Sequence, residues 1–164
     1  MGREVRMVPE NWEHPKDGFY HDGSVRYLSL YGSSFSIRAK EYADSKAAWD
    51  RGEFPDYASE ESKKLSFEEW EGEAPKESDY MPEWPAAERT HLMMYETCSE
   101  GSPISPAFKT PEELARWLAD NNASAFGSST ASYESWLATC KQGWAISAVF
   151  VPDTGLISGV EFNK

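Results

Sequence analysis

The sequence has 164 residues, enough for one domain that buries a hydrophobic core, and it carries a net charge of −12. Its hydrophobic content of 40%, with seven Trp residues, is too high for a disordered chain. No apolar run resembles a signal peptide or is long enough to span a bilayer, so we expect a cytoplasmic protein without membrane contact.

The negative charge is concentrated in the middle third of the chain. Residues 1–52 carry eight basic and eight acidic side chains, residues 53–100 carry four and fourteen, and residues 101–164 carry four and six. This acidic band repels nucleic acid, because binding to phosphates depends on cationic side chains, so we expect no direct contact with DNA or RNA. The same band would attract a basic protein surface, and the strongest basic surfaces in a cell are those that hold nucleic acid.

Thiol and metal chemistry have few candidate residues. Cys98 and Cys140 lie far apart and form no CxxC motif, which favours buried, reduced thiols. The histidines are His14, His21 and His91, and none belongs to a cluster with the spacing of a metal site. The common fingerprints of nucleotide cofactors and hydrolases are absent from the sequence as well. We therefore predict neither a metal nor a cofactor.

The first 52 residues predict a strand, an ordered loop and a helix. Alternating apolar residues indicate a short edge strand from Val5 to Pro9. Residues 11–32 combine frequent Pro and Gly with five aromatic residues, which predicts a loop held in place by its rings. Residues 34–51 lack Gly and Pro and predict a helix, with Gly52 at the position of a left-handed cap. The core-facing stripe of this helix is expected to contain Phe35, Ala39, Tyr42, Lys46 and Trp49.

Residues 53–85 form an acidic segment that is divided by prolines. Within it, Ser66 and Glu69 have the spacing of a capping box and predict a short helix. One interpretation is a solvated, partly disordered insertion. The other is that aromatic rings among the carboxylates anchor the segment on a basic, partly apolar partner, with Trp70 and Trp84 as candidate anchors. The candidate partner-binding residues are Glu68, Glu69, Trp70, Glu71, Glu73, Glu77, Asp79, Tyr80, Glu83 and Trp84.

The rest of the chain predicts a strand near 91–97, two helices and a C-terminal hairpin over 144–162. Adjacent Met93 and Met94 indicate that both faces of the strand are covered. Thr110, followed by Pro and by Glu at the third helical position, starts the first helix. The second helix ends at Gly143, and its inner face contains Tyr133, Trp136, Leu137 and Cys140.

These elements predict one α+β domain over residues 1–164. Its small sheet is expected to be mainly antiparallel, built from the strand near 91–97 and the hairpin 144–162. The helices are expected to pack on one face of the sheet. The acidic segment 53–85 is expected to be a peripheral insertion.

Two stretches resemble a family of small bacteriophage and prophage proteins. The central stretch is Tyr95-Glu96-Thr97-Cys98-Ser99-Glu100-Gly101-Ser102-Pro103-Ile104-Ser105-Pro106, and the weaker N-terminal one is Arg6-Met7-Val8-Pro9-Glu10-Asn11-Trp12-Glu13-His14-Pro15-Lys16. The resemblance covers about the first twenty residues and everything after Trp84. It implies a phage accessory gene acting in the cytoplasm of the infected bacterial host, and it implies no reaction.

Two classes of function remain open from these observations. The first is a phage protein that binds and inhibits a host anti-phage nucleic-acid-binding complex, such as a CRISPR effector, through an acidic surface containing aromatic rings. The second is an enzyme of unfamiliar type centred on the Cys98–Pro106 loop, with His91 as base and Glu96 or Glu100 to orient it. Its geometry is unfavourable, because His91 and Glu96 point to opposite faces of a strand. A minor virion or assembly protein is a third possibility.

Overall fold

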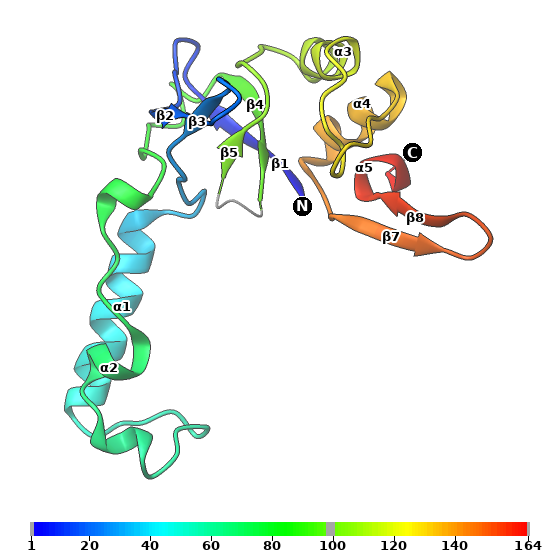
Figure 1. The fold of residues 1–164 in the computed structure, drawn as a ribbon. Helices are drawn as coiled ribbons and strands as arrows, with labels where there is room; N and C mark the ends of the chain where they lie inside the picture. The colour runs from blue at the N-terminus through cyan, green and yellow to red at the C-terminus, as the bar shows by residue number, and fades with distance from the viewer. Residues whose placement is uncertain (1, 98–100, 164) are drawn as a thin grey trace. The chain divides into compact units, whose positions relative to one another are not determined.

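The computed structural model describes residues 2–97 and 101–163. The chain forms two compact units, one containing the residues up to Leu30 and from Trp84 onward, the other Tyr31–Glu83 (Figure 1). Helices and antiparallel sheets occur together, which confirms the predicted α+β class. None of the helices in the described part of the chain has the length and apolarity needed to cross a membrane. The second unit contains most of the acidic segment 53–85 but begins at Tyr31, because the helix before this segment packs against it.

A four-stranded antiparallel sheet lies at the centre of the first unit. The strand order is β5 (Ser102–Pro103), β4 (His91–Glu96), β1 (Arg3–Val8) and β6 (Trp144–Ala145). β4 pairs with β1 along the whole length of both strands, and β6 pairs with the other side of β1 at its first two residues. The strand predicted from Val5 to Pro9 is present but starts at Arg3, and it is not an edge strand over Arg3 and Glu4, because β6 pairs with its other side there.

The two faces of β4 are covered by different parts of the first unit. This confirms the prediction that both faces of the strand near 91–97 are covered. Met94 is fully buried in the main hydrophobic core, and Leu92 packs against that core. Met93 and Tyr95 lie on the opposite face, where the Tyr95 hydroxyl contacts Trp12. The buried residues of the main core are Met94, Leu114, Ala115, Leu118, Ala125, Trp136, Cys140, Ala145 and Val160.

Two helices that pack against each other supply most of this core. α3 (Pro111–Asp120) begins at a complete capping box, in which the Thr110 hydroxyl accepts from the Glu113 N–H and the Glu113 carboxylate accepts from the Thr110 N–H. α4 (Tyr133–Gln142) ends at Gly143, whose φ of 92° is left-handed. Both helices confirm the sequence prediction. Each side-chain cap stabilises its helix by about 1 kcal/mol.

The C-terminal segment forms a hairpin, although its ends differ from the prediction. β7 (Ala148–Val151) and β8 (Gly155–Ser158) form a two-stranded sheet of their own, while the two residues of β6 pair with β1. The last predicted strand residues instead form the short helix α5 (Gly159–Phe162), because the Ser158 hydroxyl accepts from the Glu161 N–H and caps a helical turn. A side chain at Gly159 would overlap the Ile146 carbonyl, so the chain is closely packed at this turn.

The N-terminal loop predicted over 11–32 contains a short hairpin. β2 (Lys16–Phe19) pairs with β3 (Val25–Tyr27), and the register of the pair shifts between Lys16 and Gly18. Rings do hold this segment in place, as the ring of buried His14 lies edge-on to Tyr27 with centroids 5.8 Å apart.

The second unit is helical. It contains α1 (Phe35–Asp50), α2 (Phe67–Glu71) and two 3-10 turns, η1 (Ser62–Lys64) and η2 (Glu77–Asp79). α1 begins at the Ser34 side-chain cap and is followed by Gly52 at a φ of 81°, as predicted. The predicted capping box of Ser66 and Glu69 is present at the start of α2. Local side-chain caps therefore define where both helices begin.

Candidate functional site

Aromatic rings from several segments form the core of the second unit. Trp49 of α1 is only 6% exposed and lies against Phe67 of α2, with ring centroids 6.0 Å apart. Trp70 stacks on Trp49 with centroids 5.3 Å apart and ring planes 23° apart. Phe54 meets the Trp49 ring edge-on at 4.7 Å. The candidate anchor Trp70 is therefore half-buried inside its own unit, where it joins α2 to α1.

The other candidate anchoring rings also have partners within the chain. Tyr80 packs on Tyr31 and Phe35, with centroid distances of 5.2 and 5.6 Å. Trp84 belongs to the first unit, where it meets Trp12 edge-on at 4.7 Å. The structure therefore does not bring Trp84 together with the acidic residues in one unit.

The most exposed ring of the second unit is Tyr57, at 80%. It stacks on Trp70 with centroids 6.2 Å apart and planes 30° apart, so it is supported from within the unit. Sequence reasoning missed Tyr57, because a single Tyr in an acidic loop gives no signal of whether it is buried. The structure thus offers Tyr57, backed by Trp70, as the ring of this unit that is most accessible to a partner.

Four of the candidate carboxylates already have partners in the second unit. Glu68 pairs with Lys46 at 3.3 Å, and Glu73 pairs with Lys76 at 2.8 Å. Glu69 accepts hydrogen bonds from the Ser66 backbone and hydroxyl, which lower the pKa of its carboxyl group. The Glu83 carboxylate accepts from the Ser34 and Ser36 hydroxyls and the Ser36 N–H at the start of α1, and these bonds lower its pKa. Glu69 and Glu83 therefore have structural roles at helix ends.

A second group of carboxylates is exposed on the same unit. Among the described residues, Glu71 and Glu77 have exposed side chains without a hydrogen bond or ion pair, and the same holds for Asp56 and Glu61, which were not candidates. The Asp79 carboxylate accepts, within the described chain, only from the neighbouring Ser78 hydroxyl. These carboxylates are the ones that remain available to an external cation.

The residues proposed for an enzymatic site are only partly within the described chain. Cys98 and Glu100 lie outside the described residues. The Nδ1 atom of His91 is 2.9 Å from the Thr90 hydroxyl. Glu96 is buried and lies 4.0 Å from the guanidinium of Arg3, which is also buried. Burial raises the pKa of the Cys140 thiol to about 12, so this thiol is inert at neutral pH.

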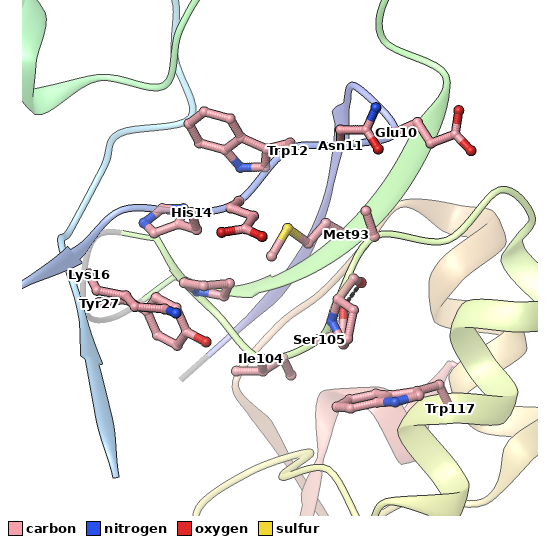
Figure 2. A pocket seen from close by; sticks show the side chains of 14 residues that line it. Glu10, Asn11, Trp12, His14, Lys16, Tyr27, Met93, Ile104, Ser105 and Trp117 are labelled. Atoms are coloured by element: carbon pink, nitrogen blue, oxygen red, sulfur yellow. Dashed lines mark hydrogen bonds between the residues drawn. The ribbon is translucent and has the colours of Figure 1, made fainter. Parts of the chain in front are cut away.

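A hollow of about 690 Å³ opens in the first unit, a volume typical of ligand sites (Figure 2). It lies between residues 10–16, the segment 103–107 and Trp117 of α3. Figure 2 shows the Trp12 and Trp117 rings on opposite sides, with Met93 and Ser105 between them. No cluster of three or more metal-ligating side chains occurs here or elsewhere in residues 2–97 and 101–163.

A chain of hydrogen bonds fixes one wall of this hollow. The Nε2 atom of His14 lies 2.6 Å from the Leu28 carbonyl, which can only accept, so Nε2 carries the proton. The Nδ1 atom lies 3.2 Å from the Tyr95 hydroxyl, whose one proton can go to Nδ1 or to the Met93 sulfur at 3.3 Å, and that hydroxyl accepts from the Trp12 indole N–H at 3.2 Å. Burial lowers the pKa of His14 and raises that of Tyr95 to about 12. Both groups are therefore neutral at pH 7.

Two polar side chains that line the hollow already have hydrogen-bond partners. The Ser105 hydroxyl accepts from the Met94 N–H at 2.9 Å and donates to the Pro106 carbonyl at 2.8 Å, so no base activates it. Both ring nitrogens of His14 are also engaged. Sequence reasoning missed the hollow because its walls come from segments about ninety residues apart.

No protein-family model matches the chain, and none of the curated proteins or solved structures is similar to it.

Proposed function

We propose that this protein is a bacteriophage accessory protein that binds and inhibits a host anti-phage complex, such as a CRISPR effector. The observation that carries the proposal is the charge of the second unit. Residues 31–83 contain seven Lys and Arg against fourteen Asp and Glu, which gives −7 of the total −12. This excess is held on a small helical unit with its own aromatic core.

Exposed carboxylates on such a unit would compete with nucleic acid for a basic channel. A nucleic-acid-binding protein attracts phosphates through clustered Lys and Arg. The carboxylates of an acidic surface can pair with the same Lys and Arg side chains. The carboxylates of Glu61, Glu71 and Glu77 are exposed and have no hydrogen bond or ion pair among the described residues, so pairing with a cation would break no internal bond. Tyr57, exposed on the same unit, would add apolar contact.

The proposal is tested with a purified CRISPR effector complex and its labelled target DNA. The protein is expected to reduce DNA binding in an electrophoretic mobility shift assay, in proportion to its concentration. Capture from a bacterial host lysate with the tagged protein, followed by mass spectrometry, extends the search to other nucleic-acid-binding complexes. If the protein captures no such complex and leaves DNA binding unchanged, the proposal is wrong.

A further inference from the structure

We propose that the hollow of the first unit is a second binding site, which takes an arginine side chain from a basic peptide segment. This inference does not depend on the carboxylates of residues 31–83. It concerns residues on β4, α3 and the N-terminal loop, and it names the chemistry of the group that enters.

The walls of the hollow suit a flat cationic group. Trp12 and Trp117 face the hollow from opposite sides, and Tyr27 also lines it (Figure 2). A guanidinium stacks on the face of an aromatic ring, and Trp is the strongest partner for such a contact. The hollow of about 690 Å³ is larger than one side chain, so it can also admit the neighbouring peptide.

The two Trp walls are held in place before any ligand arrives. Trp12 is fixed by its hydrogen bond to the Tyr95 hydroxyl and by the edge of the Trp84 ring at 4.7 Å. The Trp117 ring lies against Phe108 with centroids 6.1 Å apart. Rings that are already positioned lose little freedom on binding, which favours affinity.

The charges around the hollow favour a cation over an anion. Glu10 and Glu13 line it, both are exposed, and within the described chain neither side chain has a hydrogen bond or ion pair. Lys16 is the only Lys or Arg among the lining residues, and His14 is neutral, so the lining carries a net charge of −1. A guanidinium can stack on the face of one ring and pair with a carboxylate through two N–H groups, which an ammonium cannot do.

The test uses the full-length protein and two short peptides with uncharged flanks, which differ only in a central arginine or citrulline. Citrulline has nearly the same shape as arginine but no charge. Titration followed by tryptophan fluorescence is expected to show saturable binding of the arginine peptide and at least about tenfold weaker binding of the citrulline peptide. Equal affinity for both peptides, or no saturable binding of the arginine peptide, would overturn the proposal.

Single charge changes at exposed positions give the second arm of the test. Glu13→Gln is expected to weaken binding of the arginine peptide by about threefold, and Lys16→Gln is expected to strengthen it. Glu88→Gln, which removes an exposed carboxylate that does not line the hollow, is the matched control and should change nothing. If Lys16→Gln weakens binding of the arginine peptide, the positive charge at residue 16 does not oppose the ligand and the proposal fails. Because no host complex is present, this failure is distinguishable from failure of the proposed function.

Discussion

The Trp70 indole stacks on the Trp49 indole, with ring centroids 5.3 Å apart and planes 23° apart. This contact joins α2, which is only five residues long, to α1, and so the short helix depends on it. A ring in this position has a structural role first. In the proposed interface it would act by supporting Tyr57, which stacks on it.

The first prediction concerns the stability of the second unit. Trp70→Ala is expected to lower the free energy of unfolding by roughly 2 kcal/mol, because it removes most of a half-buried indole from an aromatic core. Tyr57→Ala should change it by less than about 0.5 kcal/mol, because the ring is 80% exposed. Urea denaturation followed by circular dichroism measures both. Equal stability of the two variants would mean that the Trp70 stack does not hold the unit together.

The second prediction concerns the charge of the same unit. Replacing Glu61, Glu71 and Glu77 with Lys changes the net charge from −12 to −6, since each reversal adds two charges. We expect slower association with a basic partner and a weaker dependence of the association rate on salt, over the range where the Debye length falls to about 10 Å. Stopped-flow mixing at several salt concentrations measures this rate.

The matched control reverses Glu88, Asp120 and Glu134 instead, three exposed carboxylates of the first unit. The net charge is then the same, so only the location of the change differs. Reversal of Glu69 is unsuitable for this experiment because its carboxylate caps α2. If both triple variants slow association equally while remaining folded, overall charge and not the second unit governs the encounter.

The third prediction concerns pH and buried His14. Burial lowers the pKa of His14 in the folded protein below its ordinary value of 6.5. Between these two pKa values the unfolded chain binds more protons, so the free energy of unfolding rises with pH. The stabilisation is complete above about pH 6.5 and is lost as the pH falls toward the folded-state pKa.

This pH dependence is measured by urea denaturation at intervals from about pH 8 to pH 5. His14→Gln should be less stable at neutral pH, because it disturbs the bond to the Leu28 carbonyl, and its stability should depend less on pH over this range. His21→Gln, at an exposed position, is the control. The explanation fails if the variant at residue 14 retains the full pH slope.

The fourth prediction concerns Gly101, whose φ of 97° is in the left-handed region. A Cβ atom there would overlap the Leu30 carbonyl and the Arg6 guanidinium. Gly23, with a φ of 84° and nothing near its missing Cβ, is the matched control for backbone strain alone. Gly101→Ala should therefore lower the free energy of unfolding by about 2 kcal/mol more than Gly23→Ala. Thermal unfolding of the two variants checks the difference, and equal losses would mean that the site has room for a methyl group.

Local signals in the sequence determined most helix ends and the central strand. The Thr110 and Ser66 capping boxes, the left-handed Gly143, and the strand near 91–97 all follow from residues within a few positions of one another. A cap is a hydrogen bond between residues three positions apart, so its contribution to helix stability depends on local sequence and not on the tertiary fold. The acidic excess is likewise a property of composition alone.

Only the tertiary structure decided which faces are available for binding. The sequence places Trp70 among carboxylates, yet packing on Trp49 makes it a core ring and leaves Tyr57 exposed. The N-terminal strand became central because β4 and β6 reach it from distant parts of the chain. The hollow likewise forms only when Trp12 and Trp117, more than one hundred residues apart in the sequence, line the same cavity. Burial of a ring depends on such long-range neighbours, and a pattern of local spacing contains no information about them.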